Sequence, residues 1–236
     1  MKFGVVLFPG SNCDDDMMHV LGEVMNAEVV KLWHKDYSLD GFTTNDCIIL
    51  PGGFSYGDYL RCGAIARFSH IMQAVIDFAN SGGYVFGICN GFQILCESKL
   101  LPGVLLANSN QKFICKNTYL RTVTTKTKLT EHLNPAQPLK IPIAHAEGRY
   151  YADEKTLNKL VKNDQILFKY CDEKGKITNA ANPNGTSLNI AGICNEKRNV
   201  FGMMPHPERA AEEILGNTDG RLLFESLMKA AMSAAH

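Results

Sequence analysis

The chain has 236 residues, 45% hydrophobic and 20% charged, which is typical of a globular protein. Its 24 basic and 24 acidic side chains cancel without forming a basic block, which argues against nucleic acid or an anionic membrane surface as a partner. The length suits one large α/β domain. Because no linker-like stretch interrupts it, we predict a single domain over residues 1–236.

The first apolar run, Phe3 to Phe8, stops at Pro9-Gly10. It is too short for the apolar region of a signal peptide or for a membrane span, so we expect a cytoplasmic protein. The eight cysteines are scattered, without Cys-x-x-Cys pairs or the histidine spacing typical of zinc sites. We therefore predict that most are reduced and structural, and that the chain holds no metal.

Predicted strands and helices alternate in the amino-terminal half. Apolar runs predict strands at 3–8, 29–33 and 47–50, and helical spacing of apolar residues predicts a helix over 65–79. A buried strand at 84–86 then leads into another helix. Short loops between alternating elements favour a doubly wound, mostly parallel sheet with helices on both faces.

The pattern changes beyond residue 95, where shorter and partly polar strands are predicted. They fall at 104–106, 112–115, 119–123, 165–171, 187–194 and 200–203. We interpret the first three of these as a small antiparallel addition at the edge of the sheet. The polar stretch 124–138 is typical of a surface loop, and residues 221–232 of a closing helix.

The stretch from Gly87 to Gly91 has the form Gly-x-nucleophile-x-Gly, with Cys89 as the nucleophile. Glycines are needed there because strand and helix pass close together, and the turn pushes the thiol out above the sheet. The unpaired N–H groups at the helix start favour a thiolate. The alternative is that Cys89 is a small buried hydrophobe, the ordinary role of a free cysteine.

The loop after strand 47–50 begins Pro51-Gly52-Gly53 and can leave backbone N–H groups open. In a parallel sheet, ligands bind beyond the carboxyl ends of the strands, so this loop can lie beside Cys89. N–H groups of Gly53 and Asn90 would then form an oxyanion hole. An ordinary glycine turn is the competing interpretation.

His206-Pro207-Glu208 is the second stretch with chemical character. The flanking prolines favour extended backbone, in which side chains two residues apart point the same way, so Glu208 can hold the imidazole. A histidine so oriented can take a proton from a thiol. His206 alone would more often be structural, but with Cys89 it predicts a triad.

Residues 142–150 bring several polar groups, among them His145, Glu147 and Arg149, into a strand-and-turn context. The segment is either part of a site or the solvated end of a hairpin, and both alternatives stay open from the residues alone.

Together, Cys89 in Gly-Ile-Cys-Asn-Gly-Phe-Gln and the distant His206-Pro-Glu208 resemble the class I (triad) glutamine amidotransferases. Further motifs resemble the glutaminase subunits of phosphoribosylformylglycinamidine synthases and span nearly the whole chain. They are Phe8-Pro-Gly-Ser-Asn-Cys-Asp14, Pro51-Gly-Gly-Phe-Ser-Tyr-Gly-Asp58, Ala144-His-Ala-Glu-Gly-Arg149 and Gly202-Met-Met-Pro-His-Pro-Glu-Arg209. Ala146 stands where the family pattern has glycine.

The resemblance implies a flavodoxin-like fold and a reaction. Cys89 attacks the side-chain amide of glutamine, His206 protonates the departing ammonia, and water hydrolyses the glutamyl thioester. Gln93 would contact bound glutamine. Backbone groups of His145, Ala146 and Glu147 would meet the backbone ends of the glutamine.

The resemblance also implies partners. Ammonia would pass to a separate synthetase subunit that uses ATP and magnesium to make formylglycinamidine ribonucleotide in purine synthesis, with a small third subunit as companion. This chain is too short to hold the ATP-dependent half and has no phosphate loop, so we expect it to bind no cofactor itself. Tyr56, Asp58 and Arg149 are candidates for the subunit contact or the ammonia exit.

Two other functions compete with this one. A stand-alone cysteine hydrolase, such as a small peptidase or deglycase, would use the same elbow, but His206-Pro-Glu208 argues against it. A thiol sensor or interaction protein would use Cys89 for oxidation and would not need Glu208.

Overall fold

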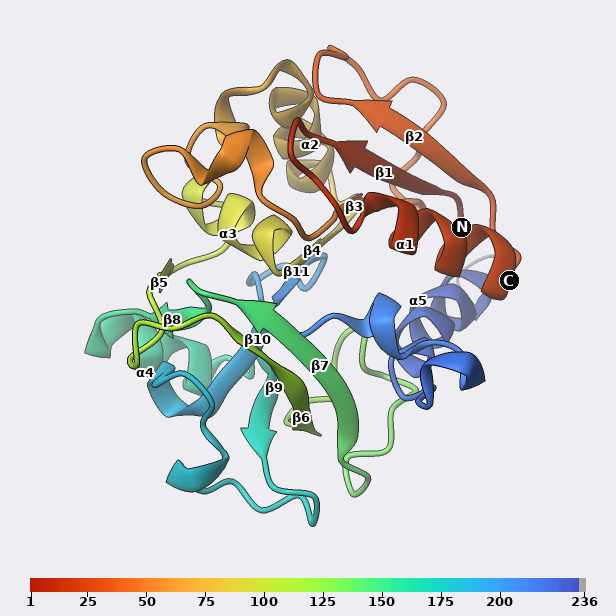
Figure 1. The fold of residues 1–236 in the computed structure, drawn as a ribbon. Coiled ribbons are helices and arrows are strands. Elements are labelled where there is room, and N and C mark those ends of the chain that lie inside the picture. Colours follow the sequence, from red (N-terminus) through yellow and green to blue (C-terminus); the bar gives the residue numbers. More distant parts are fainter. Residues whose placement is uncertain (234–236) are drawn as a thin grey trace.

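The computed structural model describes residues 1–233, and it is built around a nine-stranded sheet in the order β2-β1-β3-β4-β11-β10-β9-β6-β7 (Figure 1). A separate two-stranded sheet pairs β5 with β8. The strands are β1 (Phe3–Leu7), β2 (Val29–Trp33), β3 (Cys47–Leu50), β4 (Tyr84–Ile88), β5 (Val104–Leu106), β6 (Ile114–Thr122), β7 (Leu139–His145), β8 (Arg149–Tyr151), β9 (Ile166–Cys171), β10 (Ile190–Cys194) and β11 (Val200–Met203).

The five strands β2, β1, β3, β4 and β11 all pair in parallel. Helices α2 (His70–Asn80) and α3 (Asn90–Glu97) lie on one side of them, and α1 (Asp14–His19) and α5 (Arg221–Ser233) on the other (Figure 1). Helix α1 continues as a π-helical turn, Val20–Val24. The predicted α/β class, with a mostly parallel sheet and helices on both faces, is confirmed.

The antiparallel part is larger than the small edge addition predicted from the sequence. Strands β10, β9, β6 and β7 extend the main sheet from β11, each antiparallel to its neighbour. The two strands predicted at 112–115 and 119–123 are one strand, β6, because residues 114–120 pair with β7 without a break, although the polar residues Lys116 and Asn117 between them are exposed.

Helix α4 (Glu154–Lys162) is not predicted from the sequence, although Leu157, Leu160 and Val161 recur at helical spacing; only Leu160 is completely buried. Its start does carry a sequence signal. Asp153 is the N-cap, and its carboxylate accepts a hydrogen bond from the Thr156 N–H at 2.7 Å.

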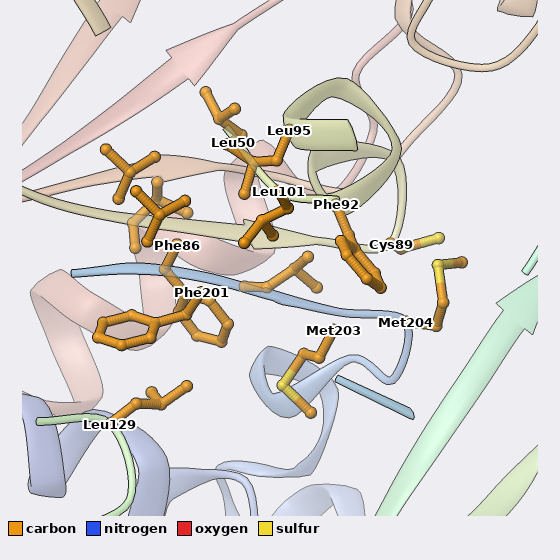
Figure 2. Packing of buried hydrophobic residues seen from close by; sticks show 14 of the residues in the cluster. Leu50, Phe86, Cys89, Phe92, Leu95, Leu101, Leu129, Phe201, Met203 and Met204 are labelled. Atoms are coloured by element: carbon orange, nitrogen blue, oxygen red, sulfur yellow. The ribbon is translucent and has the colours of Figure 1, made fainter. Parts of the chain in front are cut away.

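The hydrophobic core packs around the central strands β3, β4 and β11. Leu50, Phe86, Phe201 and Met203 are fully buried there, and Figure 2 shows them with Cys89 at one end of the cluster. Burial of each such side chain contributes about 1.5–3 kcal/mol to folding, so the strand that carries the nucleophile is firmly fixed. Among the described residues, no helix is long and apolar enough to cross a membrane.

Candidate active site

Cys89 sits in a strained turn between β4 and α3. Its φ of 51° and ψ of −105° are unusual for a residue with a side chain, and its N–H donates to the Met203 carbonyl at 2.8 Å. The flanking glycines make the turn possible. A Cβ on Gly91 would lie 1.8 Å from the Leu50 carbonyl oxygen, and one on Gly87 would lie 2.6 Å from the Gly91 carbonyl carbon.

His206 and Glu208 form a buried pair just after β11. The two side chains are 2% exposed and fully buried, respectively, and His206 Nδ1 lies 2.6 Å from Glu208 Oε1. The backbone reaches this pairing differently from the extended form predicted. Pro207–Ala210 is a 3-10 turn, because proline suits the first position of a helix as well as extended chain. The backbone N–H of His206 donates to the Pro142 carbonyl at 2.8 Å.

Electrostatics favour the protonated form of His206. Burial lowers its pKa, but the negative charge of Glu208 and the nearby Cys89 and Cys13 thiols outweigh this, and the net pKa is raised well above the usual value. Nε2 is buried and has no nitrogen or oxygen partner among the described residues. With Nδ1 engaged by Glu208, Nε2 is the atom that can exchange a proton with Cys89 and with a leaving group.

A cavity of about 200 Å³ opens beside the cysteine. It is formed by the loop after β3, the start of α3, and the end of β7 with the turn after it. Its lining includes Gly53, Asp58, Cys89, Gln93, Ala144, His145, Ala146 and Glu147. Segments far apart in the sequence thus converge at the carboxyl ends of the parallel strands, which is the usual ligand position in such sheets.

Gly53 lines the same cavity as Cys89, and Asn90 follows Cys89 directly in the chain. Gly53 has a φ of +137°, and a Cβ there would lie 2.7 Å from the Asn12 nitrogen, so only glycine fits. Asn90 is the first residue of α3, and an N–H at that position has no carbonyl within the helix to bond. Its side-chain oxygen also accepts from the Ser55 N–H at 3.2 Å, which ties the two loops together.

The segment from Ala144 to Glu147 forms one wall of the cavity, which favours the site interpretation over a solvated hairpin end. The Gln93 amide donates to the Glu147 carbonyl at 2.6 Å, so this side chain fixes the wall as well as lining the cavity. The Ala144 carbonyl lies 3.9 Å from the Cys89 thiol.

Asn108 holds that wall in place and was missed by sequence reasoning. Its amide donates to the carbonyls of Lys112 (2.8 Å) and His145 (2.9 Å), and its oxygen accepts from the Gly148 N–H at 3.2 Å. The same oxygen lies 3.1 Å from His145 Nδ1. No motif marks Asn108, because its role depends on a contact between distant segments.

His145 is neutral in the fold. Burial, followed by the charge of His206, lowers its pKa to about 4. Because the Asn108 oxygen only accepts hydrogen bonds, Nδ1 carries the proton and Nε2 is the bare nitrogen.

The three candidates for a subunit contact or ammonia exit lie in different places. Asp58 lines the cavity. The Tyr56 hydroxyl is 2.6 Å from His34 Nδ1, and Arg149 Nε donates to the Ala107 carbonyl at 2.9 Å. Neither Tyr56 nor Arg149 is among the described residues that line the cavity.

Cys13 is a second thiol beside the triad, and the sequence does not single it out. An Arg209 N–H donates to its sulfur at 3.2 Å, and Arg209 also bonds Asp16 at 3.1 Å. Potential ligand atoms of Cys13, His206 and Glu208 lie within 4.8 Å of one another. The Arg209 cation and the existing His206–Glu208 hydrogen bond both oppose a metal ion there.

Comparison with known proteins agrees with this geometry. The family model for the CobB/CobQ-like glutamine amidotransferase domain matches residues 1–223. The chain is 58% identical to the phosphoribosylformylglycinamidine synthase subunit PurQ of Moorella thermoacetica, over 97% of this chain and 95% of that one. It is 56% identical to the subunit of the same name from Koribacter versatilis, over 98% of each.

Solved structures agree with these relatives. The structure of PurLQS from Thermotoga maritima matches with a TM-score of 0.83 and 41% identity over 97% of both chains. A glutamine amidotransferase from the same organism, at 14% identity and a TM-score of 0.56 over 99% of this chain and 92% of that one, shares the fold. With Cys89, His206 and Glu208 in the family's order, and the buried His206 beside both Cys89 and Glu208, the chain belongs to the glutamine amidotransferase family of class I, triad type.

Proposed function

We propose that this chain is the glutaminase subunit of a phosphoribosylformylglycinamidine synthase. The observation that carries the proposal is the placement of Cys89 in a cavity beside the buried His206–Glu208 pair, in a chain that is 58% identical over 97% of its length to a subunit of that synthase. Motifs that resemble this group line the same cavity, at Gly53, Asp58 and Glu147.

The first chemical step forms a thioester. The Cys89 thiolate attacks the side-chain carbonyl carbon of glutamine, and the negative oxygen that develops is stabilised by N–H groups of Gly53 and Asn90. His206, charged and held by Glu208, gives the proton from Nε2 to the departing nitrogen. The carbon–nitrogen bond breaks, and ammonia leaves.

The second step regenerates the enzyme. His206, now neutral, takes a proton from water as the water attacks the thioester carbonyl. The carbon–sulfur bond breaks, glutamate leaves, and the thiolate and imidazolium pair is restored. One glutamine and one water thus give one glutamate and one ammonia.

In this proposal the ammonia is consumed by a different subunit. We propose that it passes to a separate synthetase subunit, which uses ATP and magnesium to convert formylglycinamide ribonucleotide into formylglycinamidine ribonucleotide. The Thermotoga maritima structure is named PurLQS, and this supports a complex with companion subunits. We propose that one of them is small. In this proposal the chain itself binds no nucleotide or metal and works in the cytoplasm, with Tyr56 and Arg149 as candidates for the subunit contact.

Glutamate release from glutamine tests the proposal. Wild type and Cys89→Ser are each assayed with and without the cognate synthetase and formylglycinamide ribonucleotide. Release that needs Cys89 and produces the amidine in the presence of ATP supports the proposal. Glutamate release without any amidine would leave a glutaminase serving a different synthetase, and no release at all would favour the stand-alone hydrolase or the thiol sensor.

A further inference from the structure

The side chain of Asn90 is 1% exposed and has no part in the catalytic steps, which use only the backbone N–H of this residue. We propose that this side chain is a positioning residue, which clamps the loop after β3 onto α3 and so holds the Gly53 N–H where the negative oxygen forms. The inference rests on the proposed function, because it concerns the oxyanion of the same reaction.

Both polar atoms of the Asn90 amide are engaged. Asn90 Oδ1 accepts from the Ser55 N–H at 3.2 Å. Asn90 Nδ2 donates to Gln93 Oε1 at 2.9 Å within α3, and to Asp58 Oδ1 at 3.3 Å. A backbone N–H only donates and a carboxylate only accepts, so the loop needs an acceptor and a donor on one side chain. An amide supplies both, and a carboxylate or an apolar side chain of the same size does not.

The 3-10 turn that Asn90 holds at both ends has a strained backbone. Tyr56, Gly57 and Asp58 have φ angles of 54°, 67° and 53°, in the left-handed region. Two of these residues carry side chains, for which this region costs free energy, so the turn persists only where its surroundings hold it. The Tyr56 N–H donates to the Pro9 carbonyl at 2.6 Å, which holds the middle of the turn. Loss of the Asn90 contacts should therefore let both ends relax.

The same loop carries Gly53, two residues before the turn begins. On its other side the loop contacts the segment between β1 and α1, where the Phe54 N–H donates to the Gly10 carbonyl at 3.0 Å. Gly53 is thus fixed between this backbone contact and the bond from Ser55 to Asn90. An oxyanion donor acts within about 2.7–3.1 Å of the negative oxygen, so a relaxed loop would stabilise that oxygen less.

The kinetic signature of this role differs from that of a general loss of structure. The negative oxygen develops only as Cys89 attacks, so a misplaced donor lowers kcat and leaves KM nearly unchanged. A purely structural role of Asn90 would instead lower the melting temperature and impair kcat and KM together. Asn90→Leu keeps the volume of the side chain and removes the amide, so its kcat, KM and melting temperature separate the two roles.

Exchange of donor and acceptor at the contact between Asn90 and Asp58 gives a sharper test. Asn90→Asp keeps an oxygen for the Ser55 N–H but sets one carboxylate against another. When Asn90→Asp is combined with Asp58→Asn, the amide and the carboxylate change places, and the hydrogen bond can form in the opposite sense. Asn117→Asp, at an exposed position in β6, is the matched control. Glutamate release is measured for every variant assembled with the synthetase.

We expect kcat to fall roughly 10- to 100-fold in Asn90→Leu and in Asn90→Asp, with KM within about twofold of wild type, because a misplaced oxyanion donor costs less than a deleted one. In the double variant, kcat should lie within about fivefold of that of Asp58→Asn alone, since only the contact with Gln93 stays lost. The control should match wild type in kcat and in KM.

Two results would overturn the clamp. One is a kcat in Asn90→Leu close to that of wild type. The other is a fall caused by Asn90→Asp that is equally large with Asp58 and with Asp58→Asn. Glutamate release by wild type that requires Cys89 keeps the proposed function standing in either case.

Discussion

At the scale of single residues, the chemistry depends on how Cys89, His206 and Glu208 are buried. A carboxylate 2.6 Å from a buried imidazole orients the ring and stabilises its charge, and the remaining nitrogen is left for the thiol. In a triad of this type the acid acts by fixing the tautomer and orientation of the histidine, not by taking the proton.

Replacing Glu208 by Gln tests the triad. The amide is close in shape to the carboxylate but can place an N–H against Nδ1, which reverses the ring's proton arrangement. We expect kcat for glutamate release to fall about 10²- to 10⁴-fold with little change in KM. A melting temperature close to that of wild type serves as the control for folding. Retained activity would contradict the role of Glu208 in the triad.

His145 makes the free energy of unfolding depend on pH. Its folded pKa of about 4 lies below the unfolded value near 6.5, so the neutral ring's contribution is fully present above pH 6.5 and is lost as pH falls toward 4. The shift corresponds to about 3 kcal/mol of unfolding free energy. Urea unfolding at pH 7 and pH 4 should show this loss in wild type and a smaller loss in His145→Gln. Equal losses would contradict the assignment.

At the scale of elements, the parallel half is predicted well because local signals define it. Apolar runs mark its strands, and Gly87 and Gly91 mark the turn at Cys89, where strand and helix nearly touch. The antiparallel half is predicted poorly. Strand β6 is polar in its middle and has no clear apolar period. Helix α4 has only a short one, Leu157, Leu160 and Val161, of which Leu160 alone is completely buried.

Two residues of the site cannot be predicted from the sequence, because each contacts a residue that lies far away in the chain. Cys13 meets Arg209 across 196 residues, and Asn108 meets His145 across 37. No local pattern encodes either contact. The triad could be predicted, in contrast, because the elbow glycines and the His-Pro-Glu stretch each leave a signal of their own.

Asn108→Ala should loosen the cavity wall. It removes the partner of the Lys112 and His145 carbonyls and of the Gly148 N–H, and leaves His145 Nδ1 unpaired. We expect a loss of about 2–4 kcal/mol in unfolding free energy and a higher KM for glutamine. Urea unfolding and steady-state kinetics measure the two effects.

Asn117→Ala is the matched control for this variant, because Asn117 is an exposed asparagine in the middle of β6. It should leave both the unfolding free energy and the KM close to those of wild type. A wild-type KM in Asn108→Ala would show that the wall does not depend on Asn108.

At the scale of the whole molecule, one sheet carries the nucleophile at its parallel centre and the cavity wall on its antiparallel extension. Cys89 follows β4 and Ala144 lies in β7, which belong to different halves of the sheet order. The loop with Tyr59 and Leu60, both well exposed, runs between the cavity-lining residues Asp58 and Cys62. A partner that packs on this loop would therefore act directly on the site.

Coupling to the synthetase follows from this arrangement. We expect glutaminase turnover to be weak for the chain alone and to rise at least roughly tenfold when the synthetase is present with its nucleotide substrates, because enzymes of this kind complete the site on association. Leu60→Asp should reduce the stimulation while leaving the basal rate unchanged. Equal turnover with and without the synthetase would count against the coupling.

The most direct test of the central claim is to trap the covalent intermediate. The chain is mixed with labelled glutamine in the presence of the synthetase, quenched in acid, digested, and analysed by mass spectrometry. We predict a glutamyl group, the mass of glutamine less ammonia, on the peptide that contains Cys89, and none in Cys89→Ser. Labelled glutamate formed without any adduct on Cys89, or an adduct on Cys13 instead, would contradict the assignment of Cys89 as the nucleophile.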